Sequence, residues 1–447
     1  MREIISIDVG TTNLKMVLFN SNYKVEREYL YRYKKTVISS ERFELDIDEI
    51  WQGMIQGFQD FKLKEAVDVI LTTAMHSFIV LDNDLQALTT VFAWNDSRGS
   101  DYVTSDYYIQ TGTPPHSMNP LFKVKAYKEW NEKHRLGSLK DVLYWRLTGN
   151  WWIDVANASA TGMYDLASSQ WSRSILDELQ FKPEQLPTIY PSNKYSISQI
   201  NALPIGSRIY LGTSDGVASN YAFNSFSQAG VLSIGTSHAV RMISDTPLVD
   251  KKSYNFCYEI KPKEYLIGYP SNNGGNVFEW ANQVYQSNFD ELEKVASQKN
   301  LSVTSIFLPY LNGERAPIWD DFATAEWFKL NRSQTREDIL FSLMCGVFFN
   351  IKYNVERLKK IKDFNCLAVV GGISQSNALM QLLADILDLN LMIADMRLVE
   401  TLGSIALVKE FELTFPWHII KPNPKRYQRL EEGYDLFKDI LEKQFNL

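Results

Sequence analysis

Short apolar runs that end in polar turns stand out along the chain. The first run ends at Asp8, and a second run returns at 14–19 after the turn 10–12. Two strands joined by a Gly/Thr turn are typical of a β-hairpin. The same pattern recurs at 230–243, around the turn 235–237. We interpret the two hairpins as the openings of two domains of similar plan that arose by duplication, although two unrelated hairpins would look the same.

Segments with a helical period alternate with short strands in the second half of the chain. Residues 335–360 and 377–389 repeat apolar side chains every three or four positions, as one face of a helix requires. The strand 367–370 between them runs into a glycine pair, and Ser374 or Ser376 can cap the second helix. This alternation of strands and helices predicts α/β domains.

The length of the chain and one polar stretch suggest how it is divided. A chain of 447 residues is long enough for two or three domains. Residues 165–205 contain four prolines and are interpreted as an irregular connection. Because the second hairpin begins soon afterwards, we place the boundary near residue 230 and predict domains at 1–229 and 230–447.

Composition and charge narrow the class of protein. Hydrophobic residues make up 45% of the chain and charged residues 22%, which are ordinary values for a soluble globular protein. The net charge of −7 argues against a nucleic-acid binder, because such proteins gather Lys and Arg on one surface. It does not exclude a phosphate ligand, because backbone N–H groups can hold phosphate.

The cysteines and the apolar runs fit a reducing, cytoplasmic location. Cys257, Cys345 and Cys366 are far apart and form no CxxC pair, so neither a zinc site nor a disulfide framework is predicted. No signal peptide is expected at the N-terminus, and no run approaches 18 apolar residues, so we expect no membrane partner.

Phosphoryl transfer needs a cradle for polyphosphate, a divalent cation and a base at the acceptor hydroxyl. The cradle candidates are Thr11 and Thr12 of the first turn with Gly235 and Thr236 of the second. Asp8, at the end of the first strand, can hold Mg²⁺ through water molecules. Taken alone, Asp8 is better explained as a turn aspartate bonded to its own backbone.

Two further turns supply candidates for the base and for the nucleotide. Asp215 follows the predicted strand 208–211, at the end of a strand where ligands gather in open α/β sheets. Gly371, Gly372 and Ser376 lie between a strand and a helix, where a planar base could lie against the glycine backbone. An ordinary turn explains Asp215, and a capped strand-to-helix turn explains the glycines equally well.

Three segments of the first half are candidates for an acceptor site. The segment of His76 follows a predicted strand at 69–73, and the segment of Trp94, Asp96 and Arg98 follows one at 91–94. His116 lies in a turn rich in Thr and Pro. A Trp face and polar side chains suit a polyol, and His and Arg can hold a carboxylate. The alternative is that His76 is a core histidine and His116 a turn residue.

Together these motifs resemble the FGGY carbohydrate kinase family over nearly the whole chain. The family's opening motif matches 8–12, its W-x-D-x-R element matches 94–98, and the loop of its catalytic Asp matches 212–216. The segment 311–320 resembles its L-x-G-E-R-x-P-x-W-D motif, and 371–376 resembles its adenosine motif.

The resemblance implies two actin-like, RNase-H-like α/β domains with the active site in a cleft between them. It implies ATP and Mg²⁺ as cofactors, with Asp215 as the general base and Asp8 at the metal. Thr11 and Thr236 would contact phosphates, and Gly372 and Ser376 would face the adenine. Because relatives are often dimers, a homodimer is also an expectation.

Within the family, two segments resemble gluconate kinases. Residues 74–77 read Ala-Met-His-Ser, where xylulose kinases usually read Met-His-Gly, and 111–120 carry a His-x-Met pattern that they lack. The resemblance therefore implies transfer of the γ-phosphate of Mg·ATP to D-gluconate, giving 6-phosphogluconate. The substrate-binding residues would then be His76, Trp94, Asp96, Arg98, His116 and Asp215.

Other functions remain open at this point. The chain could be another kinase of the same family, acting on xylulose or ribulose. An actin-like ATPase would need a peptide-binding or polymer-forming extension, and we find none. A sugar-sensing regulator usually has an added DNA-binding domain or has lost the base, whereas Asp215 is present here.

Overall fold

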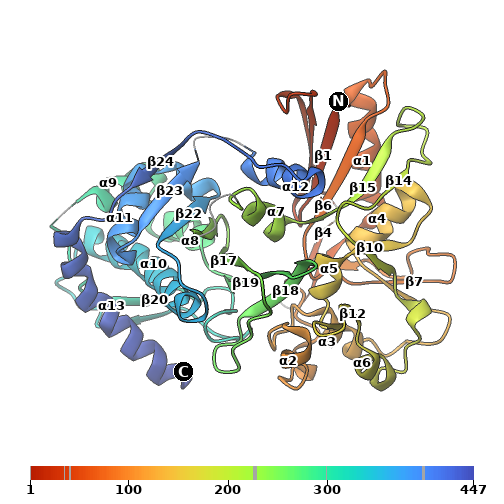
Figure 1. Ribbon diagram of the computed structural model, residues 1–447. Coiled ribbons are helices and arrows are strands. Elements are labelled where there is room, and N and C mark those ends of the chain that lie inside the picture. The colour runs from red at the N-terminus through yellow and green to blue at the C-terminus, as the bar shows by residue number, and fades with distance from the viewer. Residues whose placement is uncertain (1, 35, 40–41, 225–228, 299, 395–397) are drawn as a thin grey trace.

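Two β-sheets with flanking helices dominate the computed structural model, which describes residues 2–34, 36–39, 42–224, 229–298, 300–394 and 398–447. Figure 1 shows the sheets in two lobes that lie side by side, with the N-terminus in the first and the C-terminus in the second. The strand orders are β14-β15-β6-β1-β2-β3 and β18-β19-β17-β16-β22-β23-β24. The predicted α/β class is confirmed.

The first hairpin lies at the centre of the first sheet. β1 (Ile4–Val9) pairs antiparallel with β2 (Asn13–Phe19) and parallel with β6 (Asp68–Thr73). β15 (Arg208–Ser214) follows in parallel on the far side of β6. The parallel strands β1, β6 and β15 therefore end at the same edge of the sheet. The outer strands are β3 (Val25–Arg32) and β14 (Tyr195–Ile197).

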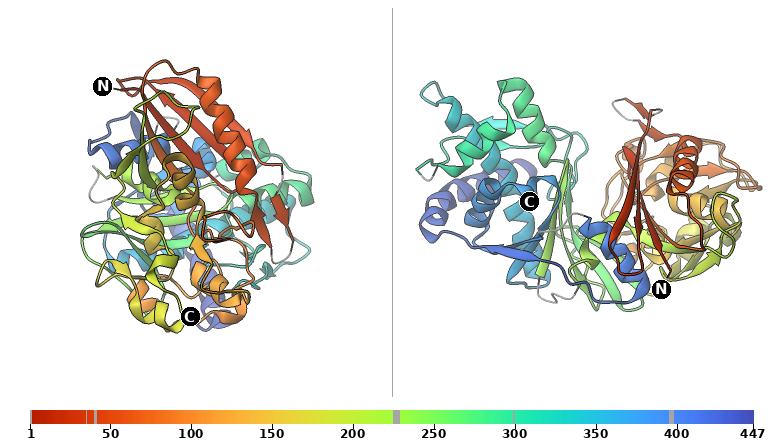
Figure 2. Two further views of the ribbon diagram at one scale, coloured as in Figure 1. Left: turned by 90° about the vertical axis from the view of Figure 1, so that its right-hand side faces the viewer. Right: turned by 90° about the horizontal axis from the view of Figure 1, so that it is seen from above.

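Helices cover both faces of this sheet. On one face, α1 (Ile47–Phe61) and α4 (Leu139–Thr148) pack against inward side chains such as Ile7. On the other face lies α12 (Val399–Lys409), which comes from the far end of the chain and packs against Ile4 and its neighbours. Figure 2 shows this blue helix beside the red strands. Burial on both faces explains why the strands are continuous apolar runs.

The second sheet repeats the arrangement around the second hairpin. β16 (Ala229–Ile234) pairs antiparallel with β17 (His238–Ser244) and parallel with β22 (Cys366–Val370). These are the relations that β1 has to β2 and β6, so the predicted similarity of plan is confirmed. The other strands are β18 (Phe256–Lys261), β19 (Glu264–Ser271), β23 (Asn390–Ala394) and β24 (Trp417–Ile420).

Both predicted helices of this lobe are present. α10 (Arg336–Ile361) begins at a capping box made by Thr335 and Asp338, and Ser376 caps α11 (Asn377–Leu387). Their apolar faces form one large core with the second sheet. The other helices of this lobe are α8 (Gly275–Tyr285), α9 (Phe289–Ser297) and α13 (Pro424–Phe445).

The predicted irregular connection at 165–205 is wrong in part, because short elements form there. α6 (Arg173–Glu178) buries Ile175 and Leu176, too few apolar positions to give a clear helical period in the sequence.

Short elements also occur elsewhere along the chain. The short strands are β4 (Thr36–Ile38), β5 (Phe43–Leu45), β7 (Ile79–Leu81), β8 (Val91–Phe92), β9 (Arg135–Gly137), β10 (Trp152–Asp154), β11 (Tyr164–Asp165), β12 (Gln170–Trp171), β13 (Thr188–Tyr190), β20 (Ile306–Leu308) and β21 (Glu326–Phe328). The short helices are α2 (Tyr108–Thr111), α3 (Pro120–Ala126) and α5 (Val155–Ser159).

Two helices join the lobes. α7 (Asp215–Tyr221) follows β15 of the first sheet, and α12 returns from the second lobe to pack beside it. The two backbones approach so closely that a Cβ at Gly403 would lie 2.0 Å from the carbonyl oxygen of Ala218. Because α12 belongs to one lobe in sequence and rests on the other, the boundary near residue 230 stays a prediction.

Candidate active site

Three parallel strands of the first sheet end in a row of oxygen-bearing side chains. Asp8 of β1 is in register with Thr72 of β6, which is in register with Thr213 of β15. Asp8 Oδ1 and both threonine hydroxyls are buried without a hydrogen-bond partner among the described residues. Buried polar atoms are seldom left unpaired, so a row of three indicates a place for a polar ligand rather than a contribution to stability.

Electrostatics mark the same edge of the sheet. Burial raises the pKa of Asp8 to about 7, and the negative charges of Asp215 and Glu400 add to the rise. Glu400, in the first turn of α12, had no predicted role. Its side chain reaches solvent, but desolvation by the surrounding protein raises its pKa, and the negative charge of Asp215 raises it further. Three carboxylates that repel one another attract a cation.

Asp215 is the first residue of α7, and Ser214 caps the helix by accepting the N–H of Val217. The Asp215 side chain is exposed, and it accepts the N–H of Gly216 at 2.8 Å. The surrounding protein displaces enough water to raise the pKa of Asp215, while the charge of Arg241 acts in the opposite direction. An accessible carboxylate with a raised pKa is suited to accept a proton from a hydroxyl group.

Lys140 of α4 holds the backbone beneath Asp215. Its fully buried ammonium group donates to the carbonyl oxygens of Leu71, of Leu211 at 2.7 Å and of Thr213 at 2.9 Å. Between the last two, Gly212 has a φ of 66°, and the pairing of β15 with β6 shifts register there. The lysine thus secures an irregular strand end that leads directly into Asp215.

The second hairpin tip packs between two glycine turns. The carbonyl oxygen of Gly235 accepts the N–H of Gly275 at 2.7 Å, at the start of α8. On the other side, Gly371 has a φ of 104°, and a Cβ there would lie 2.3 Å from the carbonyl oxygen of Ile234. The structure therefore brings the predicted 235–236 and 371–372 turns together. It adds the Gly274-Gly275 turn, which a strand–glycine–helix pattern after β19 could have revealed.

Two of these glycines face open space. A Cβ built on Gly235 or on Gly372 would meet nothing within 4 Å, so a ligand can approach the bare backbone. Thr12 and Thr236 are exposed at the two hairpin tips, and Thr11 is half-buried. Ser376 is buried, and its hydroxyl accepts the N–H of Leu379 at 3.2 Å, so its predicted contact with adenine stays a prediction.

Asp96 and Arg98 bind each other in the first lobe. Arg98 donates to both carboxylate oxygens of the fully buried Asp96, at 3.0 and 2.7 Å, and its Nη2 lies 2.8 Å from Glu44. The backbone N–H of Phe43 also donates to Asp96. Two carboxylates already neutralise this guanidinium group, so contacts of Asp96 and Arg98 with a substrate stay predictions.

His76 is a neutral imidazole of fixed orientation. Burial lowers its pKa to about 3, and Nδ1 lies 2.8 Å from the carbonyl oxygen of Ala160. Because a carbonyl oxygen only accepts, Nδ1 carries the proton and Nε2 is left as an acceptor. The hydroxyl of Tyr258, from β18 of the second lobe, lies 3.5 Å from Nε2.

His116 lies against the second lobe. Its Nδ1 accepts the N–H of Met118 at 3.1 Å, so the proton of the neutral ring is on Nε2. Nε2 lies 2.9 Å from Asp321 Oδ1, but its N–H does not point at that oxygen well enough to form a hydrogen bond. Ser100 also donates to Asp321 at 2.9 Å. Burial alone would raise the pKa of Asp321, but contacts with His116, Ser117 and Ser100 outweigh it and lower the pKa to about 2. His116 therefore bridges the lobes, and its contact with substrate stays a prediction.

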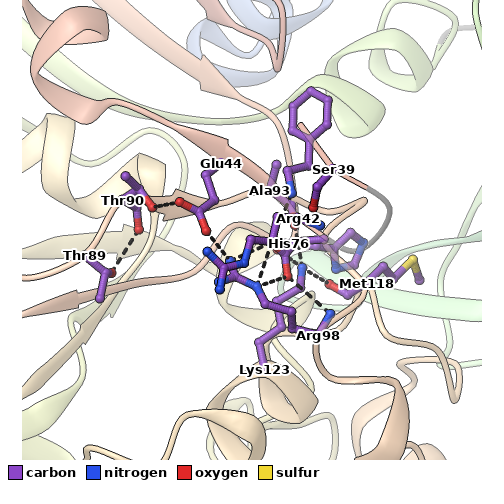
Figure 3. Close-up of polar contacts among 12 residues, drawn as sticks. Ser39, Arg42, Glu44, His76, Thr89, Thr90, Ala93, Arg98, Met118 and Lys123 are labelled. Atoms are coloured by element: carbon purple, nitrogen blue, oxygen red, sulfur yellow. Dashed lines mark hydrogen bonds and ion pairs between the residues drawn. The ribbon is translucent and has the colours of Figure 1, made fainter. Parts of the chain in front are cut away.

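Lys123 ties the three acceptor segments together. Its buried ammonium group donates to the carbonyl oxygens of Ala93 at 2.6 Å, Met118 at 3.1 Å and His76 at 3.4 Å, as Figure 3 shows. These carbonyls belong to or adjoin the segments of Trp94, His76 and His116. Segments that are distant in sequence are thus brought to one place by a residue that had no predicted role.

Arg315 is a further residue without a predicted role, although its motif was recognised. Its guanidinium group lies 4.6 Å above the ring of Trp94 and donates to the carbonyl oxygen of Ser271 at 2.8 Å. Its Nε is buried without a partner among the described residues. Burial lowers the pKa of Arg315 to about 10, so it remains a cation, and its charge acts on both Asp215 and His76.

Known proteins resemble this chain in sequence and in fold. Residues 3–203 match the N-terminal domain of the FGGY family of carbohydrate kinases, and residues 230–408 match its C-terminal domain. The chain belongs to the FGGY family of carbohydrate kinases. It is therefore a phosphotransferase with an alcohol acceptor, with ATP as the phosphate donor and a carbohydrate as the acceptor.

Individual FGGY kinases resemble the chain over most of its length. The gluconokinase of Bacillus subtilis (strain 168) is 29% identical, covering 90% of this chain and 86% of the relative. The solved gluconate kinase of Lactobacillus acidophilus has a TM-score of 0.91 at 28% identity, covering 98% of this chain and 97% of that one. A ligand-bound xylulose kinase of the same organism has a TM-score of 0.92 at 28% identity, covering 98% of both.

The match confirms the expected actin-like FGGY fold. Among the described residues, no helix is both long and apolar enough to cross a membrane. The cytoplasmic location and the homodimer stay predictions, as do the roles of the individual site residues.

Proposed function

We propose that this FGGY kinase transfers the γ-phosphate of ATP to D-gluconate and releases 6-phosphogluconate. Two gluconokinases among its relatives, from Bacillus subtilis and Bacillus licheniformis, are 29% and 28% identical over 90% of this chain. The segments of His76 and His116, which resemble those of gluconate kinases, lie beside the candidate acceptor site. The observation that carries the proposal is the cationic character of that site.

Two guanidinium groups near Asp215 suit an acidic acceptor. Arg315 is buried over Trp94, and its Nε has no hydrogen-bond partner within the described part of the chain. Arg241 acts on Asp215 from β17 while donating to Ser233 at 2.6 Å. A carboxylate on the acceptor would pair with Arg315, as planar guanidinium groups pair with carboxylates. A neutral sugar could offer the buried Nε only an uncharged acceptor.

Polar side chains beside these cations suit the hydroxyl groups of a sugar acid. Nε2 of the neutral His76 is an acceptor for a hydroxyl, and the Trp94 ring offers an apolar surface to the carbon chain. The acceptor would lie between the first lobe, which carries these residues, and the second lobe, which carries Arg315 and Tyr258.

In this proposal Asp215 takes the proton from the attacking hydroxyl. The oxygen of that hydroxyl attacks the γ-phosphorus, the bond from this phosphorus to the bridging oxygen breaks, and ADP leaves with the electron pair. Three features of the structure support the role: Asp215 is accessible, it starts a helix at a strand end, and the clamp of Lys140 fixes its position.

A magnesium ion fits the residues at the first hairpin. The unpaired Asp8 Oδ1, the row of threonine hydroxyls and the repulsion from Asp215 and Glu400 all favour a hydrated cation there. Within the described part of the chain, no group of three His, Cys, Asp or Glu side chains could hold a metal directly, so water molecules would complete its shell. Bound there, Mg²⁺ would neutralise charge on the phosphates of ATP.

Initial rates with a panel of acceptors test the proposal. D-gluconate, D-xylulose, D-ribulose and glycerol are each supplied with Mg·ATP, and ADP release is followed. We expect the highest kcat/KM for D-gluconate. A higher value for D-xylulose would make the second candidate, a xylulose kinase, the correct assignment; the solved xylulose kinase with a TM-score of 0.92 is the observation that favours it.

A further inference from the structure

Lys123 is a buried cation that, among the residues the structure describes, hydrogen-bonds to backbone carbonyls alone. The residue is 2% exposed, and its Nζ lies within hydrogen-bonding distance of three carbonyl oxygens. Three acceptors around one nitrogen match the three N–H bonds of the ammonium form, whereas a neutral amine could donate to only two of them. Among the described residues, Lys123 forms no ion pair within the 4.0 Å that a salt bridge requires.

Such a group is unfavourable for stability alone. Burial lowers the pKa of Lys123 to about 7, and the positive charge of Arg98 adds to the lowering. The more distant negative charges of Asp96 and Asp321 act in the opposite direction. A methionine of similar length would avoid desolvating a charge but would leave three carbonyls without this donor. What the desolvated ammonium group provides is therefore the link between these three carbonyls.

The three carbonyls show what the cation does. One belongs to His76 itself, one to Ala93, which precedes Trp94, and one to Met118, whose own N–H donates to the His116 ring. Each segment carries a residue expected at the acceptor. The ammonium group is thus the common point that sets the distances between the three segments (Figure 3).

We propose that Lys123 is a positioning residue for the acceptor, because its ammonium group fixes the His76, Trp94 and His116 segments at the spacing that acceptor binding needs. This inference rests on the proposed function, in which those segments contact the acceptor. It also predicts a division of labour, because Lys140 clamps three carbonyls in the same way beneath Asp215.

The matched variants Lys123→Met and Lys140→Met test the proposal. Both remove a buried ammonium group and leave three carbonyls without it, but Lys140→Met also removes the ion-pair partner of the buried Asp154, 3.6 Å away, so it should cost more stability than Lys123→Met. For Lys123→Met we expect the KM for the acceptor to rise at least about tenfold, with kcat changed less than about threefold and the KM for ATP less than about twofold. For Lys140→Met we expect the larger change in kcat.

Each result decides for or against the proposal. An equal rise in the KM values for ATP and acceptor, a loss of kcat alone, or no change in Lys123→Met would overturn it. If Lys123→Met does not fold, Lys123→Arg repeats the test, because a planar guanidinium group keeps the charge but cannot place three bonds from one nitrogen. If neither variant folds, the role is structural and the proposal fails.

The test is separate from the choice of substrate. It uses whichever acceptor the wild-type enzyme turns over fastest in the panel. A preference for D-xylulose would therefore refute the gluconate assignment without affecting the result for Lys123.

Discussion

Replacing Asp8 by asparagine should stabilise the protein while it removes activity. In the folded enzyme the Asp8 carboxylate is partly desolvated and lies in the field of Asp215 and Glu400, and these effects raise its pKa to about 7. In the unfolded chain it has an ordinary aspartate pKa. A group with a raised pKa destabilises the folded state once it is ionised, so removal of the charge is favourable above pH 7.

The structure gives an upper limit for this gain. The rise from 3.8 to about 7 corresponds to about 4 kcal/mol at 1.36 kcal/mol for each pH unit. Asp8 is only half-buried, and an amide must also be desolvated, so we expect about 1–3 kcal/mol at pH 8. The gain should be smallest near pH 4, should grow as the pH rises, and should level off above pH 7.

Thermal unfolding in the presence of EDTA and without nucleotide measures the effect. We expect Tm to rise by about 2–4 °C for each kcal/mol, the usual response of a domain of 150–250 residues. Asp96→Asn is the matched control, because the same substitution breaks a bidentate pair with Arg98 and should instead destabilise by about 1.5–3 kcal/mol. A lower Tm for Asp8→Asn at pH 8, or a gain independent of pH, would refute the reasoning.

Two further predictions concern the base and the nucleotide. Asp215→Asn should lower kcat by about 10²–10⁴ with ADP binding retained, and unchanged turnover would remove Asp215 as the base. Gly372→Ala should fold normally but weaken ADP binding, measured by calorimetry, because its Cβ enters open space at the nucleotide turn. Gly371→Ala should instead destabilise the fold, because its φ of 104° and the carbonyl oxygen of Ile234 leave no room. Equal ADP affinity in Gly372→Ala and wild type would show that no ligand occupies that space.

The parts of the site that sequence reasoning reached are those made of local turns. Asp8 and Gly235 belong to hairpins whose strands and turns are adjacent in the chain, and Asp215 follows a strand, so short-range patterns made them candidates. Their expected roles came from the family resemblance over nearly the whole chain. The helix that Ser376 caps was predicted for the same reason. The motif of Arg315 was recognised, but its contact with Trp94 depends on the way the lobes meet.

The residues that were missed act through contacts between distant segments. Lys123 and Lys140 lie in helices, and nothing in the sequence near them shows that each will be buried against three carbonyls. Glu400 reaches the site only because α12 crosses from one lobe to the other, where Leu402 of α12 packs in one cluster with Ile4 of β1, from the opposite end of the chain. Such long-range packing is not visible in a local pattern.

A competition between two acceptors tests the central claim most directly. Equal concentrations of D-gluconate and D-xylulose are mixed with the enzyme and limiting Mg·ATP, and the two phosphorylated products are separated by mass spectrometry at early times. The ratio of initial product formation equals the ratio of the two kcat/KM values. A cationic acceptor site built around Arg315 predicts that 6-phosphogluconate dominates, whereas a predominance of xylulose phosphate would contradict the account.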